Sequence, residues 1–263
     1  MIFFLQIPSQ KEAMEATYNC SLGAPYKGVN RTSTHAAKNK LIYPINLARN
    51  IARSMSETHY VLTSDVELYP SLNVIPKFLK MIFESSLSLS KYYPAVFPLP
   101  VFEIKIGTPI PNNKTELQNL LKNKLAIPFH RDICDLCHGI PKREEWIEKE
   151  DDQQLHVFHA ANRTGKHRFW EPFYIGTKAN PIFDERLSWE GMQDKIIQAY
   201  TMCLLNYTFL VLDNAFLVHR PGIKRGGSRG WRGYYMAQTH NLLKRVIVPE
   251  LHNLYGNRTG CEI

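Results

Sequence analysis

The stretch His59-Tyr-Val-Leu-Thr-Ser-Asp-Val-Glu67 places a short apolar run directly before two carboxylates. The run has the length of a buried strand, and Pro70 closes the acidic turn that follows it. Amphipathic helical spacing precedes the run, with apolar Ala48, Ile51, Ala52 and Met55 on one stripe and polar Asn46, Arg49, Asn50 and Arg53 on the opposite one. A second predicted helix follows the run and carries Leu72, Ile75, Leu79 and Phe83. The order helix, strand, acidic turn, helix predicts an α/β fold in which a mixed, mainly parallel sheet is flanked by helices. Ligands of such sheets bind beyond the carboxyl ends of the strands, where Asp65 and Glu67 are expected to lie.

A second strand end is predicted late in the chain. Residues 194–205 have a helical apolar face, and two apolar strands follow over 209–212 and 216–218, the second ending at His219. Residues 104–154 are rich in Pro, Asn, Lys and Glu and contain one helical piece, over 116–125. We interpret the segment as an insertion covering the sheet. The whole chain of 263 residues is long enough for one full core, so a single domain is expected.

Composition restricts the partners. The net charge of +8 and pI near 9.2 favour an anionic partner, which includes nucleic acid, an anionic membrane, a nucleotide or an acidic glycan. Lys and Arg are spread along the chain without a nucleic-acid-binding signature, which disfavours nucleic acid. No stretch approaches the roughly 18 apolar residues of a membrane span, so membrane attachment is expected only through an anchor outside this sequence.

Six glycosylation sequons indicate a secretory protein, since roughly two are expected by chance. They lie at Asn19, Asn30, Asn113, Asn162, Asn206 and Asn257. Five cysteines leave at least one thiol outside any internal disulfide framework. The motif Cys134-Asp-Leu-Cys137-His138 has the spacing of haem, zinc and redox sites, but a disulfide bracing the loop is the favoured interpretation because no partner motif accompanies it.

Asp65 and Glu67 could hold a hard divalent cation, Mn²⁺ or Mg²⁺, that also bridges diphosphate oxygens. His219 would complete the set, which suits Mn²⁺ better than Zn²⁺. A solvated turn and a structural histidine are the alternatives. Lys224, in a basic glycine-containing loop, is a candidate contact of the donor phosphates, although a solvated surface loop has the same composition.

Other candidates would contact donor and acceptor. Arg49 and Arg53 could meet the donor from the first helix, or pair with acidic surface residues. Flat aromatic surface and carboxylates suit the faces and hydroxyls of a sugar. The motifs Trp170-Glu-Pro172 and Phe183-Asp-Glu-Arg-Leu-Ser-Trp189 supply both. Core packing is the competing explanation for the two tryptophans. The substrate-binding candidates are Trp170, Glu171, Asp184 and Glu185.

Five blocks in order resemble the glycosyltransferase family that contains β-1,4-glucuronyltransferase and the second catalytic domain of the LARGE enzyme. They are Tyr43-Pro-Ile-Asn-Leu-Ala-Arg-Asn50, Tyr60-Val-Leu-Thr-Ser-Asp-Val-Glu-Leu-Tyr-Pro70, Trp170-Glu-Pro-Phe-Tyr174, Phe183-Asp-Glu-Arg186 and Asn214-Ala-Phe-Leu-Val-His219. The resemblance implies a GT-A nucleotide-sugar fold, a Golgi membrane protein with a lumenal catalytic domain, Mn²⁺, and inverting transfer of glucuronic acid from UDP onto a xylose-terminated glycan.

Two departures from the family pattern matter. The family motif is Asp-x-Asp, whereas the second acid here is Glu67, which reaches one methylene further. The resemblance also places the family's first strands upstream of Tyr43, where about forty residues precede it, so we expect a copy that lacks part of those strands.

Inverting transfer needs a carboxylate that removes the proton of the acceptor hydroxyl. Asp194 is the nominated base and Glu190 the reserve. The expected partners are a UDP-sugar donor and a glycan acceptor, with a homodimer left open. The rival hypothesis is a non-catalytic glycan-binding or scaffolding protein on the same fold.

Overall fold

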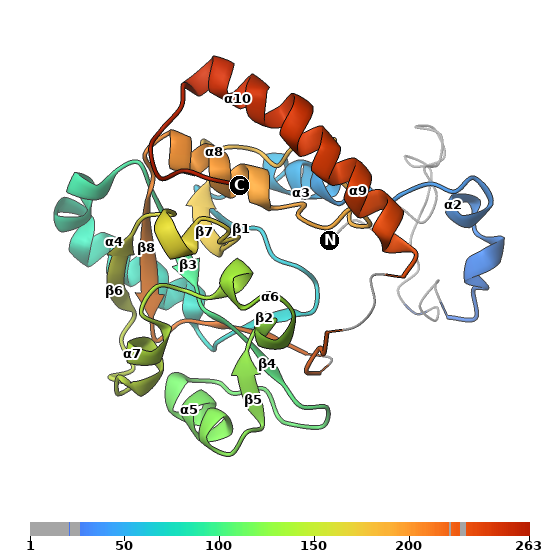
Figure 1. Cartoon of the computed structure of the whole chain (residues 1–263). Helices are drawn as coiled ribbons and strands as arrows, with labels where there is room; N and C mark the ends of the chain where they lie inside the picture. The colour runs from blue at the N-terminus through green and yellow to red at the C-terminus, as the bar shows by residue number, and fades with distance from the viewer. Residues whose placement is uncertain (1–20, 22–26, 221, 227–229) are drawn as a thin grey trace.

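The computed structural model describes residue 21 and residues 27–220, 222–226 and 230–263. Two sheets form its centre, one with the order β1-β7-β3-β8-β6 and the other with the order β2-β9-β4-β5 (Figure 1). The strands are β1 (Tyr60–Leu62), β2 (Leu68–Pro70), β3 (Ala95–Leu99), β4 (Val101–Ile104), β5 (Ala126–Pro128), β6 (His156–Ala161), β7 (Phe173–Thr177), β8 (Thr208–Asp213) and β9 (Leu217–His219).

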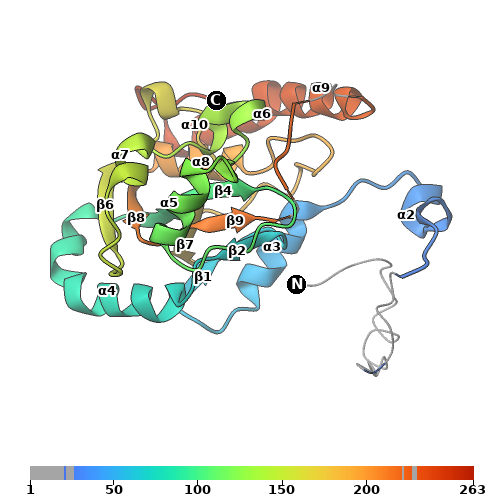
Figure 2. The ribbon, with the colours of Figure 1, turned by 90° about the horizontal axis from the view of Figure 1, so that it is seen from below.

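Helices flank both sheets. They are α2 (His35–Lys38), α3 (Ile45–Ser54), α4 (Val74–Leu89), α5 (Lys114–Lys122), α6 (Arg131–His138), α7 (Arg143–Glu148), α8 (Ile196–Leu204), α9 (Arg232–Leu242) and α10 (Val248–Tyr255). Short turns of 3-10 helix occur at Arg31–Ser33, Ser90–Tyr92 and Gly165–His167, and a π-helical turn at Leu243–Ile247 joins α9 to α10. In both views α2 lies apart from the body of the fold (Figure 1, Figure 2).

The α/β class is confirmed, but the expectation of mainly parallel pairing is wrong. Among the described strands, only β3 with β8 and β4 with β9 are parallel, and the other five pairs are antiparallel. The reason is that β7 inserts antiparallel between β1 and β3, while β5 and β6 return along the outer edges of the sheets. Alternation of helices and strands along the chain does not exclude such returns.

Helix α3 forms where its spacing predicts it, but its polar stripe faces inward. Asn46, Arg49 and Arg53 are buried, whereas Leu47 and Met55 are 39% and 67% exposed. The buried side chains are satisfied by hydrogen bonds: the Asn46 amide donates to backbone carbonyls, and the guanidinium groups of the two arginines donate to carbonyls or carboxylates. Polar contacts rather than apolar burial therefore dock this helix.

Helix α4 buries a different stripe from the one that its strongest apolar repeat suggests. Val74, Phe78 and Met81 pack into the core, and Phe78 lies edge-on to Phe97 of β3. The repeat at the other face is exposed, at Leu72, Ile75, Leu79 and Phe83. A helix that is apolar on more than one side leaves its orientation undetermined by periodicity.

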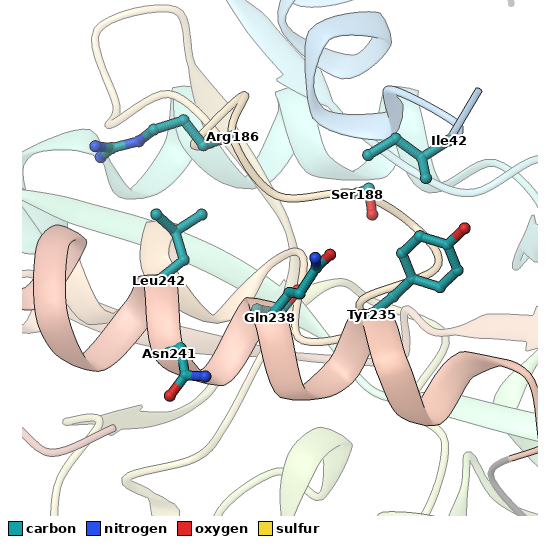
Figure 3. Close-up of a pocket in the computed structure, with 8 residues that line it drawn as sticks. Ile42, Arg186, Ser188, Tyr235, Gln238, Asn241 and Leu242 are labelled. Atoms are coloured by element: carbon teal, nitrogen blue, oxygen red, sulfur yellow. The ribbon is translucent and has the colours of Figure 1, made fainter. Parts of the chain in front are cut away.

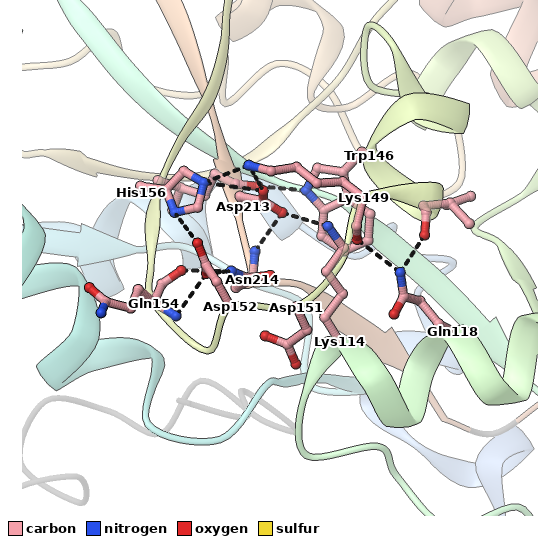
Figure 4. Close-up of polar contacts among 12 residues, drawn as sticks. Lys114, Gln118, Trp146, Lys149, Asp151, Asp152, Gln154, His156, Asp213 and Asn214 are labelled. Atoms are coloured by element: carbon pink, nitrogen blue, oxygen red, sulfur yellow. Dashed lines mark hydrogen bonds and ion pairs between the residues drawn. The ribbon is translucent and has the colours of Figure 1, made fainter.

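Residues 104–154 contribute a strand and three helices rather than the one helical piece predicted. Strand β5 extends the second sheet, and Leu117 and Trp146 are fully buried in the core. The segment is also tied down by a buried ion pair, in which Lys114 Nζ lies 2.7 Å from Asp213 Oδ1 with both side chains fully buried (Figure 4). Lys149 Nζ lies 2.6 Å from the other Asp213 oxygen. These paired charges fix the segment against β8.

Two disulfides join the described cysteines. Cys134–Cys137 lies in α6, as the sequence interpretation anticipated, and Cys203–Cys261 joins α8 to the last residues of the chain. Cys20 lies outside the described residues. Helices α9 and α10 run past α8 (Figure 1), and the second disulfide holds the tail that follows them. Within the described residues, none of the helices is both long enough and apolar enough to cross a membrane.

Candidate active site

The acidic turn and His219 meet because β2 pairs antiparallel with β9. In this register Leu68 lies opposite His219, and the Arg220 backbone N–H donates to the Glu67 carbonyl over 3.1 Å. Strand β4 runs along the other side of β9 and places Glu103 opposite His219. The juxtaposition of the acidic turn with His219 was predicted from a shared parallel edge. An antiparallel pairing produces it instead.

The His219 imidazole has one nitrogen without a partner. His219 is 1% exposed, its Nδ1 lies 3.2 Å from the Gly222 carbonyl oxygen, and its Nε2 is buried with no hydrogen-bond partner. Burial, followed by the nearby Lys224 charge, lowers the pKa of His219. The ring is therefore neutral at physiological pH, which is the form that ligates metals.

The side chains of Asp65, Glu67 and His219 are chemically suited to bind a divalent cation, but they are not arranged around a common point. A neutral imidazole nitrogen lacking a partner sits beside the carboxylates of Asp65 and Glu67, whose charges act on it. In the described part of the chain, no three His, Cys, Asp or Glu side chains are grouped closely enough to hold a metal ion as they stand. The Asp65 carboxylate pairs with Arg49, with Oδ1 2.7 Å from Nη2.

Arg49 bridges two of the predicted acids. Its Nη2 donates to Asp65 Oδ1, and its Nη1 donates to Asp194 Oδ2. Burial opposes ionisation of Asp194, but Lys195 and Arg49 outweigh it and hold the pKa of the Asp194 carboxyl below its usual value. Asp194 is thus ionised and clamped by Arg49, which links the acidic turn to the loop before α8.

Glu171 is buried close to this group and behaves differently. Burial raises the pKa of Glu171 to about 7, against the opposing effect of Lys195. Glu171 is only 6% exposed. Its backbone carbonyl oxygen lies 3.2 Å from His138 Nδ1. A carboxyl that titrates near neutrality is suited to general acid or base work.

Replacing Glu171 by Gln is expected to flatten the pH dependence of stability. The folded pKa lies above the ordinary value of 4.5, so the wild type loses stability as pH rises from about 4.5 to 7, by on the order of 1 to 3 kcal/mol. In Glu171→Gln this loss of unfolding free energy should not occur, because the amide does not titrate. Urea unfolding from pH 4.5 to 8 measures it, with exposed Glu185→Gln as the control. Parallel curves for wild type and Glu171→Gln would exclude a buried titrating carboxyl.

His130 is a site residue that the sequence interpretation missed. Its Nε2 is buried with no hydrogen-bond partner, and its ring stacks on Phe129 with centroids 3.8 Å apart. Burial, with Lys224, Lys195 and His219 nearby, lowers the pKa of His130 to about 4. It lies just after β5 in the segment interpreted as an insertion, and no spacing pattern links it to the acidic turn.

Three of the residues predicted to contact donor or acceptor make other contacts in the structure. Trp170 is 1% exposed in the core, so its face is closed to a sugar. Arg53 is buried and donates to the carbonyls of Pro181 and Asn180, rather than facing a donor. The Asp184 carboxylate pairs with Arg186.

The remaining candidates lie nearer the acidic turn or the first helix. The Glu185 carboxylate accepts a hydrogen bond from Asn50. Both Glu190 oxygens accept from the Tyr43 backbone N–H at 3.0 Å. Lys224 stays near His219 and His130, and its backbone N–H donates to Glu103.

Comparison with known proteins identifies the fold family. A family model described as "Glycosyl-transferase for dystroglycan" matches residues 3–256. Beta-1,4-glucuronyltransferase 1 of Danio rerio is 30% identical over 193 residues, covering 73% of this chain and 43% of the relative. The Homo sapiens protein of that name is 29% identical over 223 residues, covering 85% and 51%.

A more distant relative is the xylosyl- and glucuronyltransferase LARGE1 of Homo sapiens, 24% identical over 180 residues, covering 68% of this chain and 22% of the relative. The chain spans about half the length of the glucuronyltransferases it matches. The family match covers nearly all of the chain, and it agrees with mixed sheets flanked by helices. The chain therefore belongs to the glycosyltransferase family that includes beta-1,4-glucuronyltransferase 1 and LARGE1.

Proposed function

We propose that the chain is a metal-dependent inverting glycosyltransferase that transfers glucuronic acid from its UDP donor to a xylose-terminated glycan. The observation that carries the proposal is the partnerless His219 Nε2 beside the acidic turn. The printed names of the relatives support glucuronyl transfer. Since the match covers only 43% of the Danio rerio glucuronyltransferase and 22% of LARGE1, donor sugar and acceptor are proposals for this chain.

Asp65, Glu67 and His219 would hold Mn²⁺, which when bound neutralises charge on the departing UDP. The charge of Lys224 acts on both His219 and His130, which supports a role in which its ammonium group would contact the donor phosphates. Arg49 would hold Asp65 in place while it also binds Asp194. These residues together form the donor side of the site.

For the catalytic base, the position of the side chain favours Asp194, whereas the pKa of the carboxyl group favours Glu171. Asp194 lies closer to the acidic turn, through Arg49, but its lowered pKa makes it a weak proton acceptor. Glu171 has the better-matched pKa, near 7, and lies close enough to Asp194 for their charges to interact. We therefore propose Glu171 as the base and Asp194 as the residue that positions Arg49.

His219→Ala is expected to weaken Mn²⁺ binding in the presence of UDP by about 10 to 100-fold, and turnover at least as much, since an imidazole ligand is lost. Calorimetric Mn²⁺ titration checks this. His167→Ala is the matched control, because His167 is a partly buried histidine beside Trp170 with no hydrogen bond to either ring nitrogen. Unchanged metal affinity with a lower melting temperature would make His219 structural. No Mn²⁺ or UDP binding by the wild type would favour a non-catalytic glycan-binding protein.

We further propose a lumenal location in the Golgi. Two disulfides support an oxidising compartment. Four of the sequon asparagines are exposed, at Asn30, Asn162, Asn206 and Asn257. Asn113 is partly buried and caps α5, and Asn19 lies outside the described residues.

A further inference from the structure

Four aromatic side chains gather where the loop before α8 meets the start of α9. Trp189, Trp231 and Tyr234 are 44%, 64% and 67% exposed. The centroids of Trp189 and Trp231 lie 6.5 Å apart, and those of Trp231 and Tyr235 lie 5.9 Å apart. Rings from two distant parts of the chain therefore form one surface, which we call the aromatic platform. It consists of Trp189, Trp231, Tyr234 and Tyr235.

Arg232 lies within the platform. Its guanidinium carbon is 3.5 Å from the centroid of the Trp189 ring and 5.5 Å from that of Trp231. Among the described residues, no carboxylate lies within ion-pair distance of Arg232. Stacking fixes the plane of the guanidinium group and leaves its N–H edge available to an oxygen-rich ligand.

A cavity of about 350 Å³ adjoins the platform. Tyr235 is common to both, and it projects from α9 together with Gln238 and Leu242 toward the loop that carries Ser188 (Figure 3). The lining thus combines an aromatic face with amide and hydroxyl groups. This mixture suits a pyranose, which has an apolar face and a ring of hydroxyls.

One loop and the side chain of Arg49 connect the platform to the acidic turn. The loop from Trp189 continues through Gly191, where a Cβ atom would overlap with the Thr239 hydroxyl of α9, to Asp194. Asp194 is hydrogen-bonded to Arg49, which also binds Asp65. A ligand on the platform would therefore lie on the loop that ends in the proposed donor site.

We propose that Trp189, Trp231, Arg232 and Tyr235, with the adjoining cavity, bind the acceptor as an oligosaccharide. Pyranose faces stack on the rings, and Arg232 donates to hydroxyl or carboxylate oxygens. This assignment rests on the proposed function in naming the ligand as the acceptor. It replaces Trp170, whose burial closes it to substrate, with the two tryptophans that are accessible.

The distribution of tryptophans provides the test. The chain has four, of which Trp146 and Trp170 are 0% and 1% exposed, so a ligand that stacks on the platform changes only the emission of the other two. The full chain is titrated with xylotetraose and with the same oligosaccharide carrying one glucuronic acid. We expect a blue shift with at least one probe. Trp231→Ala and Arg232→Ala are each expected to weaken that binding about tenfold.

Tyr255→Ala, which removes an exposed ring on α10, is the matched control and should leave binding unchanged. No response to either probe, or equal affinity in wild type and Trp231→Ala, would overturn the platform assignment. A parallel titration with UDP and Mn²⁺ separates the two proposals. Oligosaccharide binding without UDP binding leaves the platform standing and removes the transferase proposal, while UDP binding without oligosaccharide binding does the reverse.

Discussion

Asp65→Asn is expected to lower turnover at least about a thousandfold and to abolish metal-dependent binding of UDP. The amide removes the negative charge that the cation requires, and loss of the several kcal/mol that a metal contributes to leaving-group stabilisation corresponds to such a factor. The fold should remain, because Arg49 keeps its contact with Asp194 and because the Asp65 side chain is 27% exposed.

Calorimetric titration of UDP with and without Mn²⁺ measures this effect, together with single-turnover kinetics. Asp135→Asn is the matched control, since it also removes a carboxylate paired with an arginine, here Arg143 at the start of α7. Retained Mn²⁺-dependent UDP affinity in Asp65→Asn would eliminate the metal role. Equal damage from both variants would point to a general loss of ion pairing.

Removing the Cys203–Cys261 disulfide by a double serine substitution is expected to destabilise the fold by about 4 kcal/mol. The two cysteines are 58 residues apart and are 4% and 7% exposed, so the cross-link closes a long loop from within the core. The loss should also free the C-terminal tail from α8. Guanidinium unfolding of the oxidised wild type and the double variant measures the difference.

The Cys134–Cys137 pair is the internal control, because a separation of three residues closes a much smaller loop. Its double serine variant should lose distinctly less stability. Comparable losses from both variants would show that loop length does not determine the effect. A double variant of Cys203 and Cys261 as stable as the wild type would contradict the prediction outright.

The sequence predicted the elements around the acidic turn better than their pairing. Helices α3 and α8 and strands β1, β8 and β9 form close to their predicted ranges, because local spacing determines where a helix or strand can occur. Strand direction depends on partners that lie far away in the chain. The antiparallel return of β7 between β1 and β3 leaves no local signal.

Burial of single residues was the least predictable property of the site. Trp170 and Trp189 have similar sequence surroundings, each followed by a glutamate, yet one is in the core and the other is on the surface. His130 enters the site through the packing of β5 against β4, which residue spacing cannot indicate. By contrast, the position of His219 next to the acidic turn was predictable because His219 is the polar residue that ends an apolar strand.

The inward polar stripe of α3 has a consequence for the thermodynamics of local opening. Separating this helix from the loops over residues 177–194 would break hydrogen bonds and ion pairs while exposing little additional apolar surface. Heat-capacity change and denaturant sensitivity both scale with exposed surface. The opening of α3 is therefore expected to depend less on urea than the opening of a helix that is docked by apolar burial.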